Sequence, residues 1–188
     1  MDGPLVGRAL ATLGDLLAER DQQLGVLVIG GSSLLLLGWT QRATADVDIL
    51  ALAGSEGYEP ADRLPPSLID AAAEVGRTLR LTDGWLNSGP AGLLHLGLPP
   101  GFADRVEVRL YGALEVHLPA RQDLVAFKLF AAADLYPANR KHVQDLQSIA
   151  VTAEELAAAE RWARSHDDSP GFADLVRLAV QQVREGRR

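Results

Sequence analysis

Apolar residues in the first part of the chain recur with a helical period and then crowd into a short continuous run. Leucines recur at helical spacing within residues 4–20, which predicts an amphipathic helix. Residues 24–29 form an almost unbroken apolar run, which is typical of a strand buried on both faces. Gly30-Gly31 ends this run, and the next two residues, both serine, are placed to cap a short helix through Leu37.

Three further segments predict strands: residues 46–52, which alternate apolar and polar residues only at first, and residues 105–111 and 114–118, which alternate with period two as half-buried strands do. Gly112 separates the last two segments, so they predict a hairpin or two consecutive strands. Glycines and prolines in residues 53–66 predict a surface loop, and the spacing of apolar residues predicts a helix over residues 67–79. Residues 82–103, rich in Gly, Pro and Asn, predict irregular structure.

From Pro119 onward the hydrophobic period is helical. It predicts helices over about residues 121–135, 139–150, 153–165 and 170–185. Thr152-x-x-Glu155 forms a capping box, and Pro170 occupies a favourable first-turn position. We therefore predict an α+β fold with a mixed sheet flanked by helices, in which residues 1–118 form the α/β core and residues 119–188 form a helical C-terminal part packed on that core.

Composition narrows the class of protein. The 188 residues include no cysteine, which excludes a disulfide framework, a thiolate zinc site and a cysteine nucleophile. The formal net charge is −7, and residues 1–119 carry 15 acidic and 8 basic side chains, whereas residues 120–188 carry 10 of each. An acidic first part argues against sequence-independent binding of nucleic acid over a broad surface. It is compatible with carboxylates gathered around a divalent cation.

The sequence offers no sign of membrane insertion or export. The first ten residues lack the basic start and the apolar stretch of a signal peptide. The most apolar stretch, residues 24–38, is too short for a bilayer and is interrupted by glycines and serines. We therefore expect a soluble, cytoplasmic protein.

The candidate chemistry lies where the first predicted strand ends and the second begins. Gly30-Gly31 lets the backbone approach a ligand closely, and N–H groups at the start of a following helix favour phosphate. Asp46 and Asp48 are two residues apart in a strand, so their side chains share one face. Two carboxylates side by side are stabilised by a cation, and Mg²⁺ typically binds one or two carboxylates together with substrate phosphates. This combination suits metal-assisted phosphoryl or nucleotidyl transfer.

These residues resemble a family signature. Gly-Gly-Ser followed by Arg42-x-Thr-x-Asp-x-Asp48 is similar to the motif of the DNA polymerase β-type nucleotidyltransferases. The segments Asp83-Gly-Trp-Leu-Asn87, Asp123-Leu-Val-Ala-Phe-Lys128 and Lys141-His-Val-Gln-Asp145 further resemble the AbiEii/MenT-like branch, which includes toxins of bacterial toxin–antitoxin pairs. The resemblance covers roughly residues 24–150.

The resemblance implies roles in binding a nucleoside triphosphate, the expected substrate. Gly31 and Ser32 would hold the triphosphate, and Lys128 would contact its phosphates. Arg42 would orient either the strand that carries the aspartates or a phosphate group.

It also implies a metal site. Asp46 and Asp48 would coordinate Mg²⁺ or Mn²⁺, and Asp145 would complete the catalytic site. Many members of the superfamily have a third carboxylate on a later strand, for which Glu107 and Glu115 are the candidates. We favour Glu115 as the third metal ligand, because Glu107 shares its strand face with two arginines and suits an ordinary ion pair.

The expected activity is transfer of a nucleoside monophosphate from a nucleoside triphosphate to an acceptor hydroxyl. The resemblance suggests RNA as the acceptor, in particular the 3′ end of tRNA, and a role as a toxin restrained by a cognate antitoxin protein. Two alternatives stay open: nucleotidylation of a small molecule such as an aminoglycoside, and a non-catalytic module that binds nucleotide or a partner protein. An acidic first part favours the aminoglycoside alternative, because cationic molecules are drawn to acidic clefts.

Overall fold

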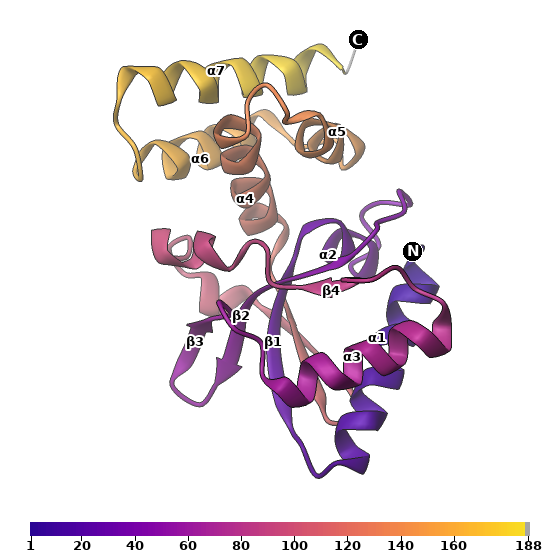
Figure 1. Cartoon of the computed structure of the whole chain (residues 1–188). Helices are drawn as coiled ribbons and strands as arrows, with labels where there is room; N and C mark the ends of the chain where they lie inside the picture. Colours follow the sequence, from indigo (N-terminus) through magenta and orange to yellow (C-terminus); the bar gives the residue numbers. More distant parts are fainter. Residues whose placement is uncertain (187–188) are drawn as a thin grey trace. The chain divides into compact units, whose positions relative to one another are not determined.

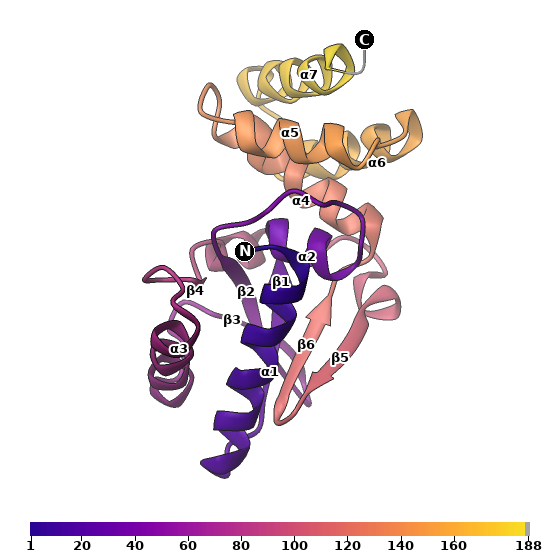
Figure 2. The same ribbon diagram turned by 90° about the vertical axis from the view of Figure 1, so that its right-hand side faces the viewer.

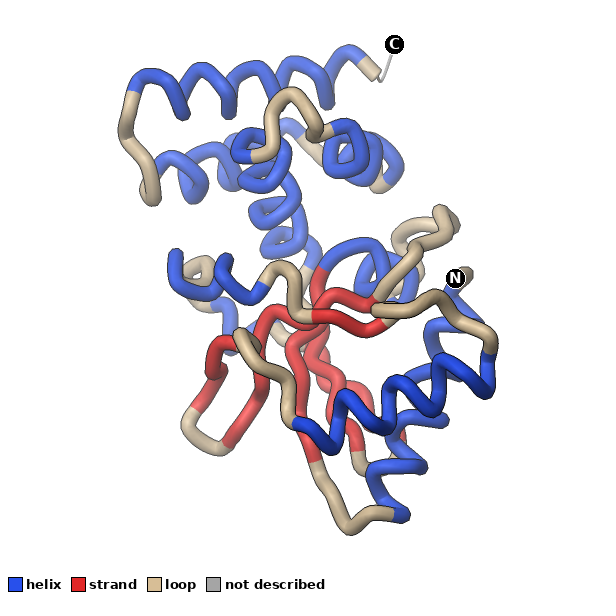
Figure 3. Tube along the Cα trace, in the orientation of Figure 1, coloured by secondary structure: helices blue, strands red, loops and turns tan. Residues whose placement is uncertain are grey.

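The computed structural model describes residues 1–186, in which the predicted α+β class is confirmed. A mixed six-stranded sheet is flanked by helices and is followed in the chain by a helical region (Figures 1 and 3). The chain divides into two compact units. The first comprises Met1–Leu98 and Ala103–Pro119, and the second comprises Pro99–Phe102 and the chain from Ala120 onward.

The first unit contains the sheet. Its strands are β1 (Leu24–Ile29), β2 (Val47–Gly54), β3 (Gly57–Pro60), β4 (Leu86–Asn87), β5 (Glu107–Tyr111) and β6 (Leu114–Leu118). The spatial order is β3-β2-β1-β6-β5, and β4 pairs with β2. β1 and β6 run parallel, whereas β2 is antiparallel to β1 and to β3, and β5 is antiparallel to β6. Because β2 runs antiparallel to β1, the end of β1 lies next to the start of β2, where the candidate site residues lie.

Two helices cover one face of this sheet. They are α1 (Gly3–Glu19) and α3 (Pro66–Leu79), which contribute to one apolar core with β1 and β6. Leu13 and Leu17 of α1 share this core with Val26 and Val116 of the sheet, and Figure 2 shows α1 lying across β1 and β6. The amphipathic helix predicted over residues 4–20 is thus present, and Asp2 caps it by accepting a hydrogen bond from the backbone N–H of Leu5.

Two local predictions in this unit are wrong. The stretch predicted as a surface loop, residues 53–66, contains β3, a four-residue edge strand whose glycines and prolines hide its pairing. The short helix α2 (Gly30–Leu36) starts at the first glycine, so Ser32 and Ser33 lie inside it and do not cap it. Their hydroxyls instead donate to the last carbonyls of β1, Ser32 to Ile29 at 3.2 Å and Ser33 to Val28 at 2.6 Å. Both serines therefore bind the helix to the strand that precedes it.

The second unit contains the four helices predicted after Pro119. They are α4 (Arg121–Asp134), α5 (Arg140–Ser148), α6 (Ala153–Arg164) and α7 (Pro170–Glu185). Aromatic rings of α4, α6 and α7 pack edge-on or tilted in its interior, with Phe130 contacting both Trp162 and Phe172. Across residues 1–186, no helix combines the length and the apolar character that a membrane span requires.

The predicted capping box at the start of α6 is confirmed and is reinforced from α4. Thr152 and Glu155 exchange hydrogen bonds between side chain and backbone, and Arg121 donates to both carboxylate oxygens of Glu155 at 2.6 and 3.3 Å. Burial alone would raise the pKa of the Glu155 carboxyl, but the hydrogen bonds from Arg121 and Thr152 outweigh it and lower the pKa below its usual value. The charged form of Glu155 therefore ties α6 to α4.

Candidate active site

Asp46 and Asp48 lie at the start of β2, next to the end of β1. Asp46 directly precedes the strand, and Asp48 faces Ile29, the last residue of β1. The two carboxylates are half-buried, so each lies in the protein surface and stays accessible to a small ligand. Asp48 lies against Gly30, and Thr44, which lies against Gly31, contacts Asp46, so both acids lie beside the glycine turn.

The two glycines after β1 allow the acidic residues to approach closely. Gly30 has φ +83°, and a Cβ built on it would lie 2.6 Å from Oδ2 of Asp48. A Cβ on Gly31 would lie 3.0 Å from Oγ1 of Thr44. Any other residue at position 30 would therefore meet both backbone strain and the Asp48 carboxylate.

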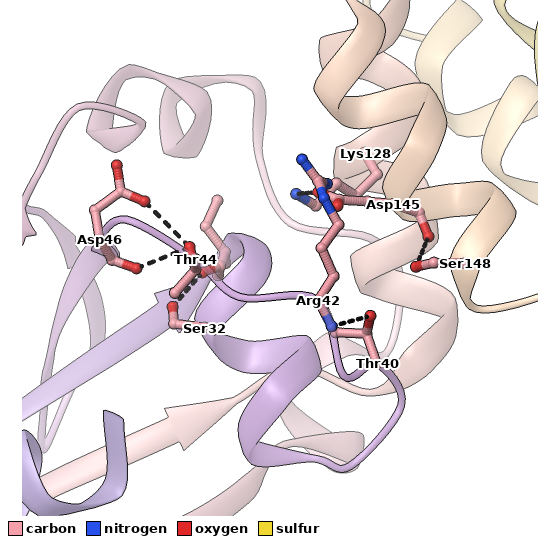
Figure 4. A network of polar contacts seen from close by, with 9 residues as sticks. Ser32, Thr40, Arg42, Thr44, Asp46, Lys128, Asp145 and Ser148 are labelled. Atoms are coloured by element: carbon pink, nitrogen blue, oxygen red, sulfur yellow. Dashed lines mark hydrogen bonds and ion pairs between the residues drawn. The ribbon is translucent and has the colours of Figure 1, made fainter. Parts of the chain in front are cut away.

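Polar neighbours hold both aspartates. The buried hydroxyl of Thr44 lies 3.3 Å from Oδ1 of Asp46 and 3.2 Å from its carbonyl oxygen (Figure 4). Thr44 is itself held by its backbone N–H, which donates to the carbonyl of Met1 at 2.9 Å. Asn87, on β4, donates through Nδ2 to Oδ1 of Asp48 at 3.3 Å. The site is thus supported by the chain start, by the loop before β2 and by β4.

The role of Asn87 as a neighbour of Asp48 was not predicted from the sequence. It follows from β4, a strand of two residues that pairs Asn87 with Asp48, and a strand this short leaves no alternation to detect. The available signal was the Asp83–Asn87 segment, whose composition indicates only an irregular loop. Trp85, in the same segment, is buried and donates to the carbonyl of Ala72 at 2.8 Å, so its ring packs in the core.

Three of the residues expected to hold nucleotide phosphates lie in α2 or in the loop that follows it. Gly31 and Ser32 are buried in its first turn, and the Ser32 hydroxyl is engaged with Ile29, so this serine presents its backbone more readily than its side chain. Arg42 lies exposed in the loop between α2 and β2, where its backbone N–H donates to Oγ1 of Thr40 at 3.1 Å (Figure 4). The loop therefore places a cationic side chain four residues before Asp46.

Lys128 and Asp145 form a buried ion pair in the second unit. Nζ of Lys128, on α4, lies 2.5 Å from Oδ2 of Asp145, on α5, and the two side chains are only 6% and 5% exposed (Figure 4). The structure thus brings these two predicted residues together, each as the other's partner. The pair ties α4 to α5, so Asp145 is a salt-bridge partner in helix packing.

The structure does not bring Glu115 to the aspartates. Glu115 on β6 faces Gly25 of β1, whereas Asp48 faces Ile29, four residues further along. Four strand residues span about 13 Å, and β1 lies between β2 and β6, so the two carboxylates are too far apart to share one metal ion. The expectation that Glu115 is a third metal ligand is therefore wrong in this structure, because alternation predicts the face of a strand residue but not its register.

Glu115 belongs instead to a separate polar cluster on the same sheet. Its Oε2 lies 3.7 Å from Nε2 of His117, and Nδ1 of His117 lies 2.9 Å from the hydroxyl of Tyr58 on β3. Burial raises the pKa of the Tyr58 hydroxyl, so it stays protonated and can act as the donor. The sequence did not indicate this contact, because β3 itself was predicted as a loop.

The carboxylate pair fits a divalent cation with open coordination positions. Within residues 1–186, no three His, Asp or Glu side chains converge on one point, so the protein supplies at most the two carboxylates. Two carboxylates with phosphates and water completing the shell is a common arrangement for Mg²⁺. Asn87 and Thr44 fix the orientation of these carboxylates, as supporting residues around a metal site do.

Comparisons with known proteins give one match. The profile of the family described as "Nucleotidyltransferase of unknown function (DUF6036)" matches residues 8–154, a span that includes both aspartates and the Lys128–Asp145 pair. No curated protein and no solved structure matches the chain significantly. Since the matched span covers well over half of the chain, this protein belongs to that nucleotidyltransferase family.

Proposed function

We propose that the protein transfers a nucleoside monophosphate from a nucleoside triphosphate to an RNA hydroxyl, with the 3′ end of tRNA as the acceptor. The family supports nucleotidyl transfer in general. The observation that carries the proposal is the pair of half-buried carboxylates, Asp46 and Asp48, at the end of β1 and beside the glycine turn. The AbiEii/MenT-like resemblance adds the RNA acceptor and a role as a toxin restrained by an antitoxin protein.

The site residues of the first unit each have a part in the proposed reaction. Asp46 and Asp48 would hold Mg²⁺, which would supply neutralisation of the triphosphate charge. Gly30 leaves room for the Asp48 carboxylate, and Asn87 keeps that carboxylate oriented. The backbone of Gly31 and Ser32 and the guanidinium of Arg42 bind the triphosphate.

The roles of Lys128 and Asp145 depend on the strength of their ion pair. The resemblance implies that Lys128 contacts the nucleotide phosphates and that Asp145 completes the catalytic site. Their ion pair, which ties α4 to α5, supports an additional role in positioning these helices. A nucleotide that binds Lys128 therefore has to compete with Asp145 or to bind the pair together.

A second candidate acceptor is a cationic small molecule such as an aminoglycoside. The observation that favours it is the charge of residues 1–119, which carry 15 acidic and 8 basic side chains. An acidic surface attracts a polycation and repels the phosphates of RNA. The chemistry at the aspartates is the same for both acceptors, so the acceptor has to be identified by experiment.

The test is a label-transfer assay. The protein is incubated with Mg²⁺ and each of the four α-labelled nucleoside triphosphates, with total tRNA, with an aminoglycoside, or with neither. We expect label on tRNA, and a loss of at least about a hundredfold in Asp46→Asn and in Asp48→Asn, because removal of one charge-stabilising group typically costs that much in rate. Asp70→Asn, which changes an exposed aspartate of α3, is the matched control and should transfer normally.

Three outcomes would overturn parts of the proposal separately. Label on the aminoglycoside alone would replace the RNA acceptor and retain the catalytic aspartates. Normal transfer by both aspartate variants would overturn their role. Nucleotide binding without transfer to either acceptor would favour a non-catalytic module.

A further inference from the structure

The edge of the sheet formed by β5 is open on its outer side. β5 stands at the end of the strand order, and within residues 1–186 only β6 pairs with it. On one face of β5 lie Val108 and Leu110, which are 49% and 72% exposed. An exposed apolar edge strand is a template for pairing with another chain unless charges or a covering element block it.

The hairpin geometry decides which backbone groups point outward. Tyr111 and Leu114 flank a two-residue turn, so they close it as a hydrogen-bonded pair. Hydrogen-bonded and non-hydrogen-bonded pairs alternate along an antiparallel ladder. Arg109 and Glu107 therefore direct their backbone groups toward β6, whereas Val108 and Leu110 direct theirs away from the sheet.

The other face of β5 carries a pair of opposite charges. Nε of Arg109 lies 2.6 Å from Oε1 of Glu107, and Nη1 of Arg109 donates to the carbonyl of Leu36 at 2.5 Å. Both side chains are partly exposed and lie on one side of the outer edge. The charges stand one residue to either side of Val108, so the strand is electrostatically complementary to an antiparallel copy of itself.

We propose that a second copy of this chain pairs antiparallel with β5 through a two-fold axis at Val108. In this register Val108 faces Val108 of the other copy as a hydrogen-bonded pair, and Val106 faces Leu110, so every outward backbone group finds a partner. Glu107 faces Arg109 twice, which extends each intrachain ion pair into a ring of four charges. The sheets of the two copies then join into one continuous sheet.

Charge selects this register over its neighbours. A shift that centres the axis on Arg109 places two arginines directly opposite each other, and one centred on Glu107 places two glutamates opposite. Like charges at directly facing positions destabilise a strand pair. Only the axis at Val108 makes both charged pairs favourable while it matches the outward hydrogen-bonding groups.

Sedimentation velocity over a range of concentrations tests the pairing. We expect a monomer–dimer equilibrium, with the dimer dissociation constant raised about tenfold by Glu107→Arg, which places like charges at both facing positions. The double variant Glu107→Arg/Arg109→Glu should restore the dimer, since the charges are complementary again. Glu59→Arg, the same charge change on the opposite edge strand β3, is the control and should leave the dissociation constant unchanged.

A second variant removes the central hydrogen bonds. Val108→Pro deletes the outward N–H at the axis, and an edge strand tolerates proline where the N–H faces solvent, so the monomer should keep its fold and lose the dimer. Circular dichroism and the melting temperature check the fold of each variant. A chain that stays monomeric at all concentrations, or a dimer that neither Glu107→Arg nor Val108→Pro weakens, would overturn the proposal.

Cross-linking tests the register directly. The chain has no cysteine, so a single introduced thiol reports on one position. Facing residues at the axis have Cα atoms about 5.5 Å apart, whereas two copies of residue 110 are separated by four residues along the strands, about 13 Å. A short bismaleimide should therefore link Val108→Cys several-fold faster than Leu110→Cys, although Leu110 is the more exposed. Equal rates would contradict this register.

Discussion

Gly30 is the first residue of α2, and Gly38 lies two residues after its end. A comparison of the two positions separates the cost of crowding the Asp48 carboxylate from the cost of backbone strain. Both residues have positive φ angles, +83° and +73°. A Cβ on Gly38 would meet no atom within 4 Å, whereas a Cβ on Gly30 would lie 2.6 Å from Oδ2 of Asp48. An alanine at either position carries a similar backbone strain, and only the one at position 30 displaces the carboxylate.

We therefore expect the two alanine variants to differ in both stability and activity. Gly38→Ala should lower the free energy of unfolding by about 1–2 kcal/mol, the usual cost of a left-handed backbone with a Cβ. Gly30→Ala should lower it further and should reduce nucleotidyl transfer at least about tenfold, because a shift of a catalytic group by 1 Å or less costs rates of this order or more. Urea denaturation and the label-transfer assay measure the two effects.

Equal stability of the two variants with equal activity would contradict this argument. It would mean that the Asp48 carboxylate rotates away from position 30 at no cost. In that case neither Asn87 nor the glycine turn would hold the carboxylate in a functional orientation.

The helices α4 and α5 carry the next prediction, which separates the structural role of Lys128 and Asp145 from a catalytic one. Removal of one member of a buried ion pair leaves an uncompensated charge and typically costs about 3–5 kcal/mol, whereas replacement of both by apolar residues is often neutral. Asp145→Leu, which leaves the buried Lys128 charge without this carboxylate, should lower the free energy of unfolding by that amount, and Lys128→Met should also lower it. The double variant should recover most of the loss in a urea titration.

The activity of the double variant then identifies the role. If Lys128 binds nucleotide phosphates, the well-folded double variant keeps a raised KM for the nucleoside triphosphate. Full recovery of KM and kcat together with stability would leave the pair a purely structural role. Arg177→Met, which breaks the exposed pair with Asp174 on α7, is the control and should change stability by less than about 1 kcal/mol.

The elements show how far sequence patterns reach. The main helices and the strands β1, β2 and β6 follow from apolar runs or hydrophobic periodicity, because their apolar residues are buried, whereas β5 follows from alternation although its Val108 and Leu110 are exposed. The Thr152–Glu155 capping box was recognisable from spacing alone. β3 and β4 could not be predicted, since strands of four and two residues exist only through the partner that pairs with them. Because these two strands were not predicted, the contact of Asn87 with Asp48 and the contact of Tyr58 with His117 could not be predicted either.

Site residues divide in the same way. A spacing of two in a strand predicts Asp46 and Asp48 on a shared face, and the structure has Asp48 in β2 and Asp46 just before it, both beside the glycine turn. Glu115 was wrongly assigned to them, because its distance from Asp48 depends on the register of two pairings through β1. The Lys128–Asp145 contact joins two helices whose packing angle no local pattern encodes.

On the scale of the whole molecule, the distribution of charge constrains how an acceptor is bound. The excess of acidic side chains lies in residues 1–119, and residues 120–188 are balanced. An RNA acceptor therefore has to be held by cations of the second unit. Arg161 and Arg164 of α6 line one surface hollow of about 430 Å³, which Glu160 and Asp168 also line, and are the cations there that a phosphate backbone could contact together.

If the acceptor is tRNA, Arg161→Gln/Arg164→Gln should raise its KM roughly tenfold at low salt, because each phosphate bound by an arginine adds to the affinity through counterion release. The slope of log KM against log salt should also fall by about 0.7–0.9 for each phosphate that the variant no longer binds. KM for the nucleoside triphosphate should not change, and Arg63→Gln/Arg77→Gln, two exposed arginines of the first unit, should leave both values unaltered. Steady-state kinetics at several salt concentrations measure all of these.

A KM for tRNA that is insensitive both to salt and to the α6 arginines would exclude electrostatic RNA binding by this helix. The tRNA would then be bound at another surface of the protein, and α6 would have no part in acceptor binding.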